Sequence, residues 1–445
     1  MKQEVLRLEN VSCQENGVVQ LDRFNLSILS GEIMGLLPVN SHGLTALLKL
    51  LQRNTPLRYG YVYYRERQIN TWRTVKRRRN RIGLIQSESC LVEGLTVADN
   101  IFVLRPDFKT WYLRPSVLRK QLAPLLEDAG VRIPADAYVG ELDAFEKVVV
   151  DILKSVAAGC RLIVLRDIGS DIGGDELKKI HRLLKRFTKD GISFLYIGFH
   201  FNELRQICGK IAFMSNGGVV KVMRREEFER YAGLLSSGSA GGNIAEGGSK
   251  ENGAPVVFEA RNLTAGRIEG MNFTVRRGEC VFIQDADIRV LGEVVSVLCG
   301  ETPVAEGALL LEGRVFKPKL GGDVAVIQEL PTASMLFHEM SYLDNLCFQL
   351  DRRIPEIWRG QNVRKGVRRE YANVLGDVFD KRVGQLSEPQ KYELVYTRVL
   401  IQKPKAVFCV QPFRSADAEL RALILKLIKR LTDAGISVVI LAVNL

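Results

Sequence analysis

The sequence predicts an α/β protein made of two similar domains in tandem, each built on a mostly parallel sheet. Short apolar runs, such as residues 161–165 and 437–443, alternate with helical patterns, such as residues 175–191. Such alternation is typical of strands that helices bury on both faces. A Gly- and Ser-rich stretch lies near the middle, and the two halves around it repeat one spacing of strands, turns and helices.

The central stretch sets the expected domain boundaries. It reads LLSSGSAGGNIAEGGSKENGAP and holds few apolar residues. Such a segment cannot bury enough surface to order itself, which is typical of a flexible linker. We therefore predict an N-terminal domain over residues 1–233, a linker over 234–255 and a C-terminal domain over 256–445.

Each half opens with two alternating, half-polar strands that end in Gly-Glu, at residues 31–32 and 278–279. A second glycine lies 29 residues after the glycine of each Gly-Glu pair. It is Gly60 in the first half and Gly307 in the second. The half-polar strands predict an antiparallel β subdomain attached to each parallel sheet. A duplication explains the shared spacing.

Composition narrows the classes of function. The chain has 445 residues, 46% of them hydrophobic and 26% charged, as in an ordinary folded protein. No apolar run approaches a membrane span and the first residues lack a signal-peptide core, so we expect a cytoplasmic protein without membrane insertion. The eight scattered cysteines predict buried free thiols. The net charge of +12 suits nucleic acid, anionic lipid or an acidic partner, and chooses none of them.

The stretch PVNSHGLT has the place and spacing of a phosphate-binding loop, GxxxxGK[ST], between a predicted strand and a predicted helix. Such a loop binds an anion through backbone N–H groups at a helix N-terminus and through its lysine. Here Pro38 replaces the first glycine and Leu44 replaces the lysine. Asn40, Gly43 and Thr45 remain as candidate nucleotide-binding residues, and Thr45 matches the hydroxyl that would hold Mg²⁺.

The order of segments resembles the ATP-binding cassette family, specifically the tandem-cassette ATPases of sugar importers of the ribose, galactose and xylose type. The first half carries GEIMGLLPVNSHGLTALLKLL in the Walker A place, RIGLIQSESCLVEGLTVADNIF in the Q-loop place, LDAFEK in the signature place, RLIVLRD in the Walker B place and FLYIGFHFNELRQICGK at the His switch. The second half follows with GECVFIQDADIRVLG, GQLSEPQKYELVYTRVL and AVFCVQPF. The resemblance implies two P-loop NTPase-like folds, each with an antiparallel β and a helical subdomain, the second truncated at its C-terminus.

The resemblance also places further candidate residues. Vestigial Walker A, Walker B and switch positions are Asn40, Gly43, Leu44, Thr45, Gln86, Arg166, Asp167 and His200, and signature-like positions are Leu386 and Ser387. Arg166 and Asp167 stand where the family has an Asp that supports Mg²⁺ and a Glu that orients water. Gln86 and His200 each lie one residue from the aligned place, and a one-residue shift would restore them. Arg166 is otherwise expected to pair with Asp167 or Asp171, or to face solvent.

The second half departs further from the family. Val410 and Gln411 hold the Walker B places, and Asp285 and Asp287 put carboxylates where phosphates would bind.

From these substitutions we predict a catalytically inactive cassette protein, a pseudo-ATPase rather than an enzyme. We expect no cofactor, since the lost charges make ATP and Mg²⁺ doubtful ligands. The chain would act as a structural or regulatory binding module at the inner face of the cell membrane, linked to a sugar import system. The resemblance implies a permease, a companion ATPase or a sensory protein as partner, or pairing between cassettes.

Two alternatives stay open. The first is a sugar-importer subunit that still binds ATP at a degenerate site. The second is a soluble tandem cassette associated with nucleic acid or the ribosome. The basic excess favours the latter, but the Gly- and Ser-rich linker differs from the charged helical linker of those proteins, so nucleic acid is not expected.

Overall fold

The computed structural model divides the chain into a first unit, Met1–Gly238, and a second unit, Ser239–Leu445. The structure describes residues 3–15, 17–53, 55–70, 80–86, 89–102, 115–230, 254–284, 288–317, 322–348, 361–375 and 378–443. Most of the predicted linker, together with Asp285 and Asp287, lies outside these ranges.

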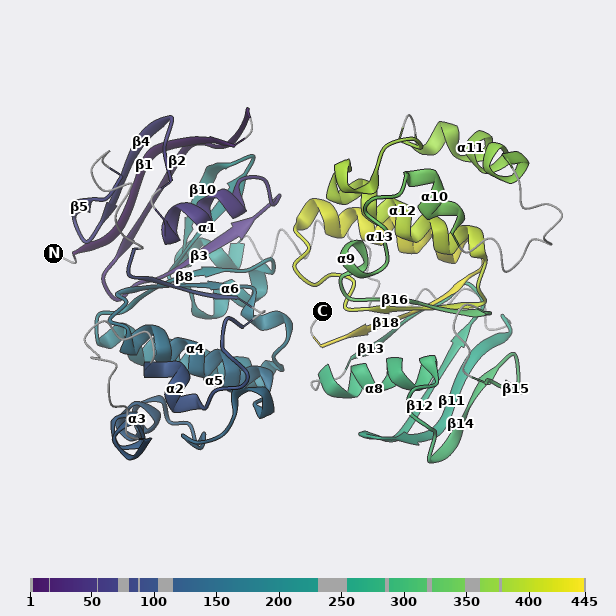
Figure 1. The fold of residues 1–445 in the computed structure, drawn as a ribbon, viewed down its shortest axis with the longest axis horizontal. Helices are drawn as coiled ribbons and strands as arrows, with labels where there is room; N and C mark the ends of the chain where they lie inside the picture. The colour runs from purple at the N-terminus through teal and green to yellow at the C-terminus, as the bar shows by residue number, and fades with distance from the viewer. Residues whose placement is uncertain are drawn as a thin grey trace. The chain divides into compact units, whose positions relative to one another are not determined.

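Two sheets build the first unit (Figure 1). The antiparallel sheet has the order β2 (Val18–Leu29), β1 (Glu4–Glu15), β4 (Tyr59–Tyr64) and β5 (Arg67–Gln68). The second sheet has the order β10 (Gly218–Arg224), β9 (Lys210–Ser215), β3 (Ile33–Pro38), β8 (Ser193–Ile197), β7 (Leu162–Arg166) and β6 (Ile82–Gln86). All of its neighbours pair in parallel except β10 with β9.

Helices cover both faces of the six-stranded sheet, as its apolar strands require. Alternate residues of β8 enter different cores: Leu195 packs with α1 (Leu44–Gln52) and the antiparallel sheet, whereas Phe194 packs with α4 (Ala144–Ala157) and α5 (Gly174–Lys189). Figure 1 shows α1 on one side of the sheet and α4 and α5 on the other. The remaining helices of this unit are α2 (Val97–Phe102), α3 (Pro115–Ala129), α6 (Phe201–Ile207) and the 3₁₀ turns at Val139–Glu141, Ile168–Ser170 and Arg225–Glu227.

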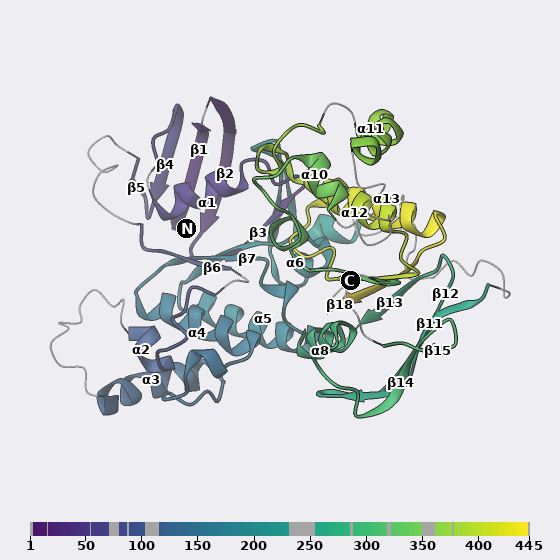
Figure 2. The ribbon, with the colours of Figure 1, turned by 45° about the vertical axis from the view of Figure 1, so that its right-hand side comes forward.

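The second unit repeats this plan. Its antiparallel sheet has the order β12 (Ile268–Arg276), β11 (Val256–Ala265), β14 (Glu306–Leu311) and β15 (Arg314–Val315). Its parallel sheet has the order β13 (Cys280–Gln284), β18 (Ser437–Ala442), β17 (Ala406–Val410) and β16 (Val324–Ile327). Figures 1 and 2 show α8 (Ile288–Cys299) on one face of this sheet and α12 (Glu388–Gln402) and α13 (Ala418–Asp433) on the other.

Four further elements of the second unit are described. They are α9 (Pro331–Ser334), α10 (Tyr342–Cys347), α11 (Gln361–Leu375) and a 3₁₀ turn at Val383–Gln385. Among the described residues, this unit has no strands that correspond to β9 and β10.

Strand register shows that the units share one fold. In the first unit, Leu36 of β3 and Arg166 of β7 both pair with Ile197 of β8. In the second, Ile283 of β13 and Val410 of β17 both pair with Leu441 of β18. The predicted fold class, two α/β folds in tandem with antiparallel β subdomains, is confirmed.

The repeated glycine has a steric cause. Gly60 has φ +98°, and a Cβ there would stand 2.3 Å from the carbonyl oxygen of Asn10. Gly307 has φ +80°, and its Cβ would stand 2.2 Å from the carbonyl oxygen of Asn262. A left-handed φ beside a close backbone favours glycine at both positions.

Two further expectations meet the structure here. Among the described residues, no helix is both long and apolar enough to cross a bilayer. No disulfide joins any of the eight cysteines, and of these only Cys13, Cys160, Cys208 and Cys409 are buried, whereas Cys90 is exposed. The expectation of buried thiols is therefore wrong for Cys90, which lies in a connecting segment rather than in a core strand or helix.

Candidate functional site

The loop between β3 and α1 is held by backbone contacts. The Val39 amide donates to the carbonyl oxygen of Met214 at 2.8 Å, which ties the end of β3 to β9. Gly43 has φ +80°, and a Cβ there would stand 2.2 Å from the carbonyl oxygen of Gln20 in β2. Only glycine fits this close approach.

Asn40 holds the other side of the loop. Its side chain is 8% exposed, its Nδ2 donates to Oδ1 of Asn216 at 2.9 Å, and its Oδ1 accepts from the Asn216 amide at 3.0 Å. These bonds join the loop to the turn between β9 and β10. The Asn40 amide group thus positions the loop.

In the first turn of α1, the side chains of the two residues that follow Gly43 lie in different environments. Leu44 is 1% exposed and packs in the core beneath the antiparallel sheet, so its side chain is part of the apolar interior. Thr45 is exposed. The Leu44 amide donates to Ser41 and the Leu47 amide to Gly43. The amides of Thr45 and Ala46 lie where a helix offers them no internal acceptor, so this turn fits a phosphate group.

Arg166 and Gln86 meet at the carboxyl ends of β7 and β6. The Arg166 Nη1 donates to Oε1 of Gln86 at 3.2 Å, and both residues are half-buried. Gln86 is therefore the hydrogen-bond partner of Arg166, and the expected pairing of Arg166 with Asp167 or Asp171 is wrong. The reason is the parallel register, which places Gln86 directly beside Arg166.

Asp167 follows Arg166 in a left-handed conformation with φ +53° and is 3% exposed. Its amide donates to the Ile197 carbonyl at 2.8 Å, and its Oδ1 accepts from the Ser170 hydroxyl at 2.6 Å. Mg²⁺ takes oxygen ligands, whereas a guanidinium brings only donors and a positive charge. The strand end at Arg166 therefore does not fit a magnesium ion.

A partly buried acid that the sequence analysis missed lies near Asp167. The Tyr196 hydroxyl of β8 donates to the Glu203 carboxylate of α6. The pKa of Glu203 is raised to about 7, chiefly by burial and also by the negative charge of Asp167, while the hydrogen bond from Tyr196 acts in the opposite direction. A Cβ at Gly169 would stand 2.5 Å from Glu203 Oε1. The only sequence signal was an acidic residue three places after His200.

His200 precedes α6 as its N-cap, with φ −114°, and lies three residues beyond the end of β8. Because β8 lies between β3 and β7, the three strands end at the same edge of the sheet. The carboxyl ends of β3 and β8 therefore lie at one edge of the sheet. The loop with Asn40, Gly43 and Thr45 follows β3, and His200 follows β8. Gln86, Arg166 and Asp167 lie at the same edge, at the ends of β6 and β7.

The signature-like residues cap and pack a helix of the second unit. Leu386 is 6% exposed in the core, and Ser387 caps α12 in a capping box with Gln390. In the first unit, Asp143 and Glu146 form the same capping box at α4. The LDAFEK and LSEPQK stretches thus share a helix start, which satisfies the free amides of the first turn.

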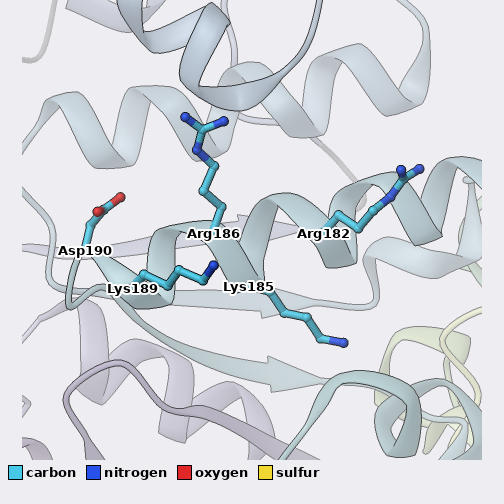
Figure 3. Close-up of a pocket in the computed structure, with 5 residues that line it drawn as sticks. All are labelled: Arg182, Lys185, Arg186, Lys189 and Asp190. Atoms are coloured by element: carbon cyan, nitrogen blue, oxygen red, sulfur yellow. The ribbon is translucent and has the colours of Figure 1, made fainter.

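A basic cavity of 510 Å³ lies elsewhere in the first unit, lined by Arg182, Lys185, Arg186, Lys189 and Asp190. These residues lie in the last turns of α5 and directly after it, where the chain leads into the amino end of β8. The cavity therefore lies at the edge of the sheet opposite to the loop. Figure 3 shows Arg186 and Lys185 pointing in opposite directions. The side chains do not converge on one anion.

Comparison with known proteins connects this edge of the sheet to a family. The ABC transporter family matches residues 21–166, which run from β2 through the loop to Arg166 at the end of β7.

Full-length relatives match both units. A ribose import ATP-binding protein of Rubrobacter xylanophilus is 25% identical over 98% of this chain and 90% of its own length. A ribose import ATP-binding protein of Caldanaerobacter subterraneus is 23% identical over 99% of this chain and 91% of its own length. Among solved structures, cbiO1 of Clostridium perfringens is 17% identical, with a TM-score of 0.47 over 54% of this chain and 95% of its own.

Two predictions are wrong in the light of these comparisons. The ABC transporter match and the ATP-binding relatives point to ATP-dependent enzymes, which contradicts both the pseudo-ATPase and the absence of a cofactor. The predictions gave too much weight to Pro38 and Leu44. Phosphate binding at a helix N-terminus depends chiefly on backbone amides, and the leucine at position 44 leaves those of Thr45 and Ala46 in place.

The register shared by the two units, the family match and the full-length relatives lead to one assignment. Residues 21–166 match the ABC transporter family, and nearly the whole chain is similar to ribose import ATP-binding proteins.

Proposed function

We propose that this protein is the ATP-binding subunit of a sugar ABC importer, and that its first unit binds ATP at the loop between β3 and α1. One observation carries the proposal: the similarity to ribose import ATP-binding proteins extends over 98% of the chain and 90% of the relative, and so includes both units. A second relative is named for ribose, galactose and methyl galactoside import. The expected cargo is therefore a small sugar.

The loop supports the proposal chemically. The amides of Thr45 and Ala46 at the start of α1 would bind phosphate oxygens, and the exposed Thr45 hydroxyl would add a further contact. Gly43 lets the backbone take its left-handed turn before the helix. ATP, when bound, supplies the free energy for import. The residues of this chain bind and orient it.

The expected partner is a permease at the inner face of the membrane. In the second unit, Phe337 and Phe348 are each 46% exposed and their ring centroids lie 4.6 Å apart. The Asn345 side chain fixes Phe337, because it accepts from the Phe337 amide and donates to its carbonyl oxygen, both at 2.9 Å. Exposed aromatic side chains are typical of protein interfaces. They follow the Q-loop place, which in the family receives the permease.

A companion ATPase, a sensory protein or pairing between cassettes belongs to the same proposal. Each would appear with the permease when the tagged chain is purified from gently solubilised membranes. A complex that lacks a permease would argue against the importer assignment.

The direct test is calorimetric titration of the purified chain with Mg·ATP, beside thermal unfolding. A ligand that binds the native state at a hundred times its Kd stabilises it by about 2.7 kcal/mol, so the melting temperature rises. Heat release and a raised melting temperature at millimolar ATP would support the proposal. If neither is seen, ATP binding is excluded.

A further inference from the structure

Arg166 places a positive charge at the end of β7. In a nucleotide-binding cassette, positive charge that balances the phosphates is expected near this edge of the sheet. Arg166 is half-buried and donates to Gln86 at 3.2 Å. Among the described residues, which leave out Ser87 and Glu88, no carboxylate forms an ion pair with Arg166. A guanidinium has five donors, and the bond to Gln86 uses one of them.

Strand register places this cation close to the loop. Arg166 and Leu36 both pair with Ile197 of β8, so they lie at the same level of the sheet. Two strand spacings separate them, which is about 10 Å. The loop begins after Pro38, two residues beyond Leu36 on the same strand. A phosphate chain that starts at the first turn of α1 therefore extends over the edge of the sheet where Arg166 lies.

Guanidinium and phosphate are complementary in charge and geometry. Arginine stays protonated, and its planar fork can donate two parallel hydrogen bonds to phosphate oxygens. A half-buried cation without a carboxylate carries an electrostatic cost, which a bound anion would remove. The side-chain carbonyl oxygen of Gln86 accepts a hydrogen bond from the guanidinium and so positions it. Because Gln86 is neutral, this bond does not cancel the positive charge of Arg166.

We propose that Arg166 binds the phosphate chain of the nucleotide directly, positioned by Gln86, so that ATP binding depends on Arg166 more than on a divalent cation. The inference rests on the proposed ATP-binding function and names the residue that supplies the counter-charge. The second unit has Val410 at the corresponding register position and so lacks this cation.

The test measures ATP affinity by calorimetry, in Mg²⁺ and in EDTA, for the full chain and five variants, one of them a double variant. Wild type should bind ATP in both, with dissociation constants within about tenfold. Arg166→Ala should weaken binding in both by about tenfold to a hundredfold, the loss expected for one charged hydrogen-bonding group. Arg166→Lys should recover part of the affinity, because it restores the charge without the fork. Melting without ATP checks that the variants fold.

Arg161→Ala is the matched control. Arg161 precedes β7, so it lies at the opposite end of the same strand, where its Nη1 donates to the Asp190 carbonyl oxygen at 3.2 Å. Its removal changes the net charge by the same amount and should leave ATP affinity unchanged.

Gln86→Ala tests the positioning role. It should weaken ATP binding in the wild-type background and have no further effect in Arg166→Ala, because Gln86 acts through the guanidinium. An equal loss in both backgrounds would show that Gln86 acts independently and would overturn its role.

The outcomes separate this inference from the proposed function. If wild type binds ATP only with Mg²⁺, or if Arg166→Ala binds as wild type does, the role of Arg166 is overturned and the ATP-binding function stands. If wild type binds ATP in neither condition, the proposed function fails and the inference fails with it.

Discussion

At the scale of single residues, close approaches of the backbone restrict which residue type fits a position, and burial changes the pKa of a charged group. Gly307 and Gly60 recur at equal spacing because, in each unit, a carbonyl of the neighbouring strand occupies the place of a side chain. Glu203 lies partly buried beside Tyr196 and has a raised pKa. The first feature was visible in the sequence as a repeat, whereas the second was not.

We predict that Gly307→Ala destabilises the second unit by about 2 kcal/mol or more, because its Cβ would lie 2.2 Å from the Asn262 carbonyl oxygen at φ +80°. Chemical denaturation of the full chain measures the loss. Gly292→Ala is the control, since Gly292 lies inside α8 with no atom within 4 Å of an added Cβ. Alanine there should be neutral or stabilising. Equal effects of the two changes would contradict the steric explanation.

Glu203 predicts a pH dependence of stability. Folding raises its pKa from 4.5 to about 7, so the folded chain holds this proton more tightly than the unfolded chain. The stabilising contribution is complete below pH 4.5 and is lost as the pH rises through 7. Glu203→Gln keeps an acceptor for the Tyr196 hydroxyl and does not ionise.

The unfolding free energy of Glu203→Gln should therefore equal that of wild type near pH 4.5. Above this pH it should exceed the wild-type value progressively, by up to about 3 kcal/mol at pH 8. Unfolding free energies measured across this range give the difference, and other titrating groups cancel because both proteins share them. A difference that does not change with pH would show that Glu203 titrates normally.

At the scale of elements, an asparagine side chain binds the backbone of the preceding segment in the same way in both units. Asn100 in the first unit and Asn345 in the second each bond to the amide and carbonyl of a residue eight positions earlier, Val92 and Phe337. Each asparagine fixes the segment that precedes a short helix, α2 or α10. The second segment also exposes Phe337, whose ring lies tilted against the exposed ring of Phe348.

We predict that Phe337→Asp abolishes copurification of the permease while it changes the melting temperature little, because the Phe337 side chain is 46% exposed. A charged side chain at the centre of an apolar contact would remain without a partner on binding. Val315→Asp is a suitable control, since Val315 is 68% exposed in β15. Retention of the permease by Phe337→Asp would exclude this segment from the interface.

At the scale of the whole molecule, two copies of one fold carry unequal sites. The first unit has Arg166 at the strand end, and the second has Val410 at the same register position. From the sequence we also expect Asp285 and Asp287, which lie outside the described residues, to repel phosphate in the second unit.

We predict a stoichiometry of one ATP per chain in the calorimetric titration. The electrostatic difference between the units favours the first site alone. A stoichiometry of two would show that the second unit binds nucleotide in spite of its carboxylates.

The sequence by itself determined the tandem α/β fold, the place of the loop and the glycines that the repeat requires. These follow from local periodicity and from steric limits on single residues, which are written in short stretches of chain. The tertiary structure decided what the candidate residues contact. Gln86 and Arg166 lie 80 residues apart, and only the parallel register of β6 and β7 makes them partners.

Sequence spacing also could not show that Leu44 packs in the core while Thr45 is exposed, or that Glu203 lies beside Tyr196. The burial of a charge and the partner that compensates it depend on which elements pack together. The functional error arose there: lost side-chain charges are visible in the sequence, whereas backbone amides at a helix N-terminus are set by the fold.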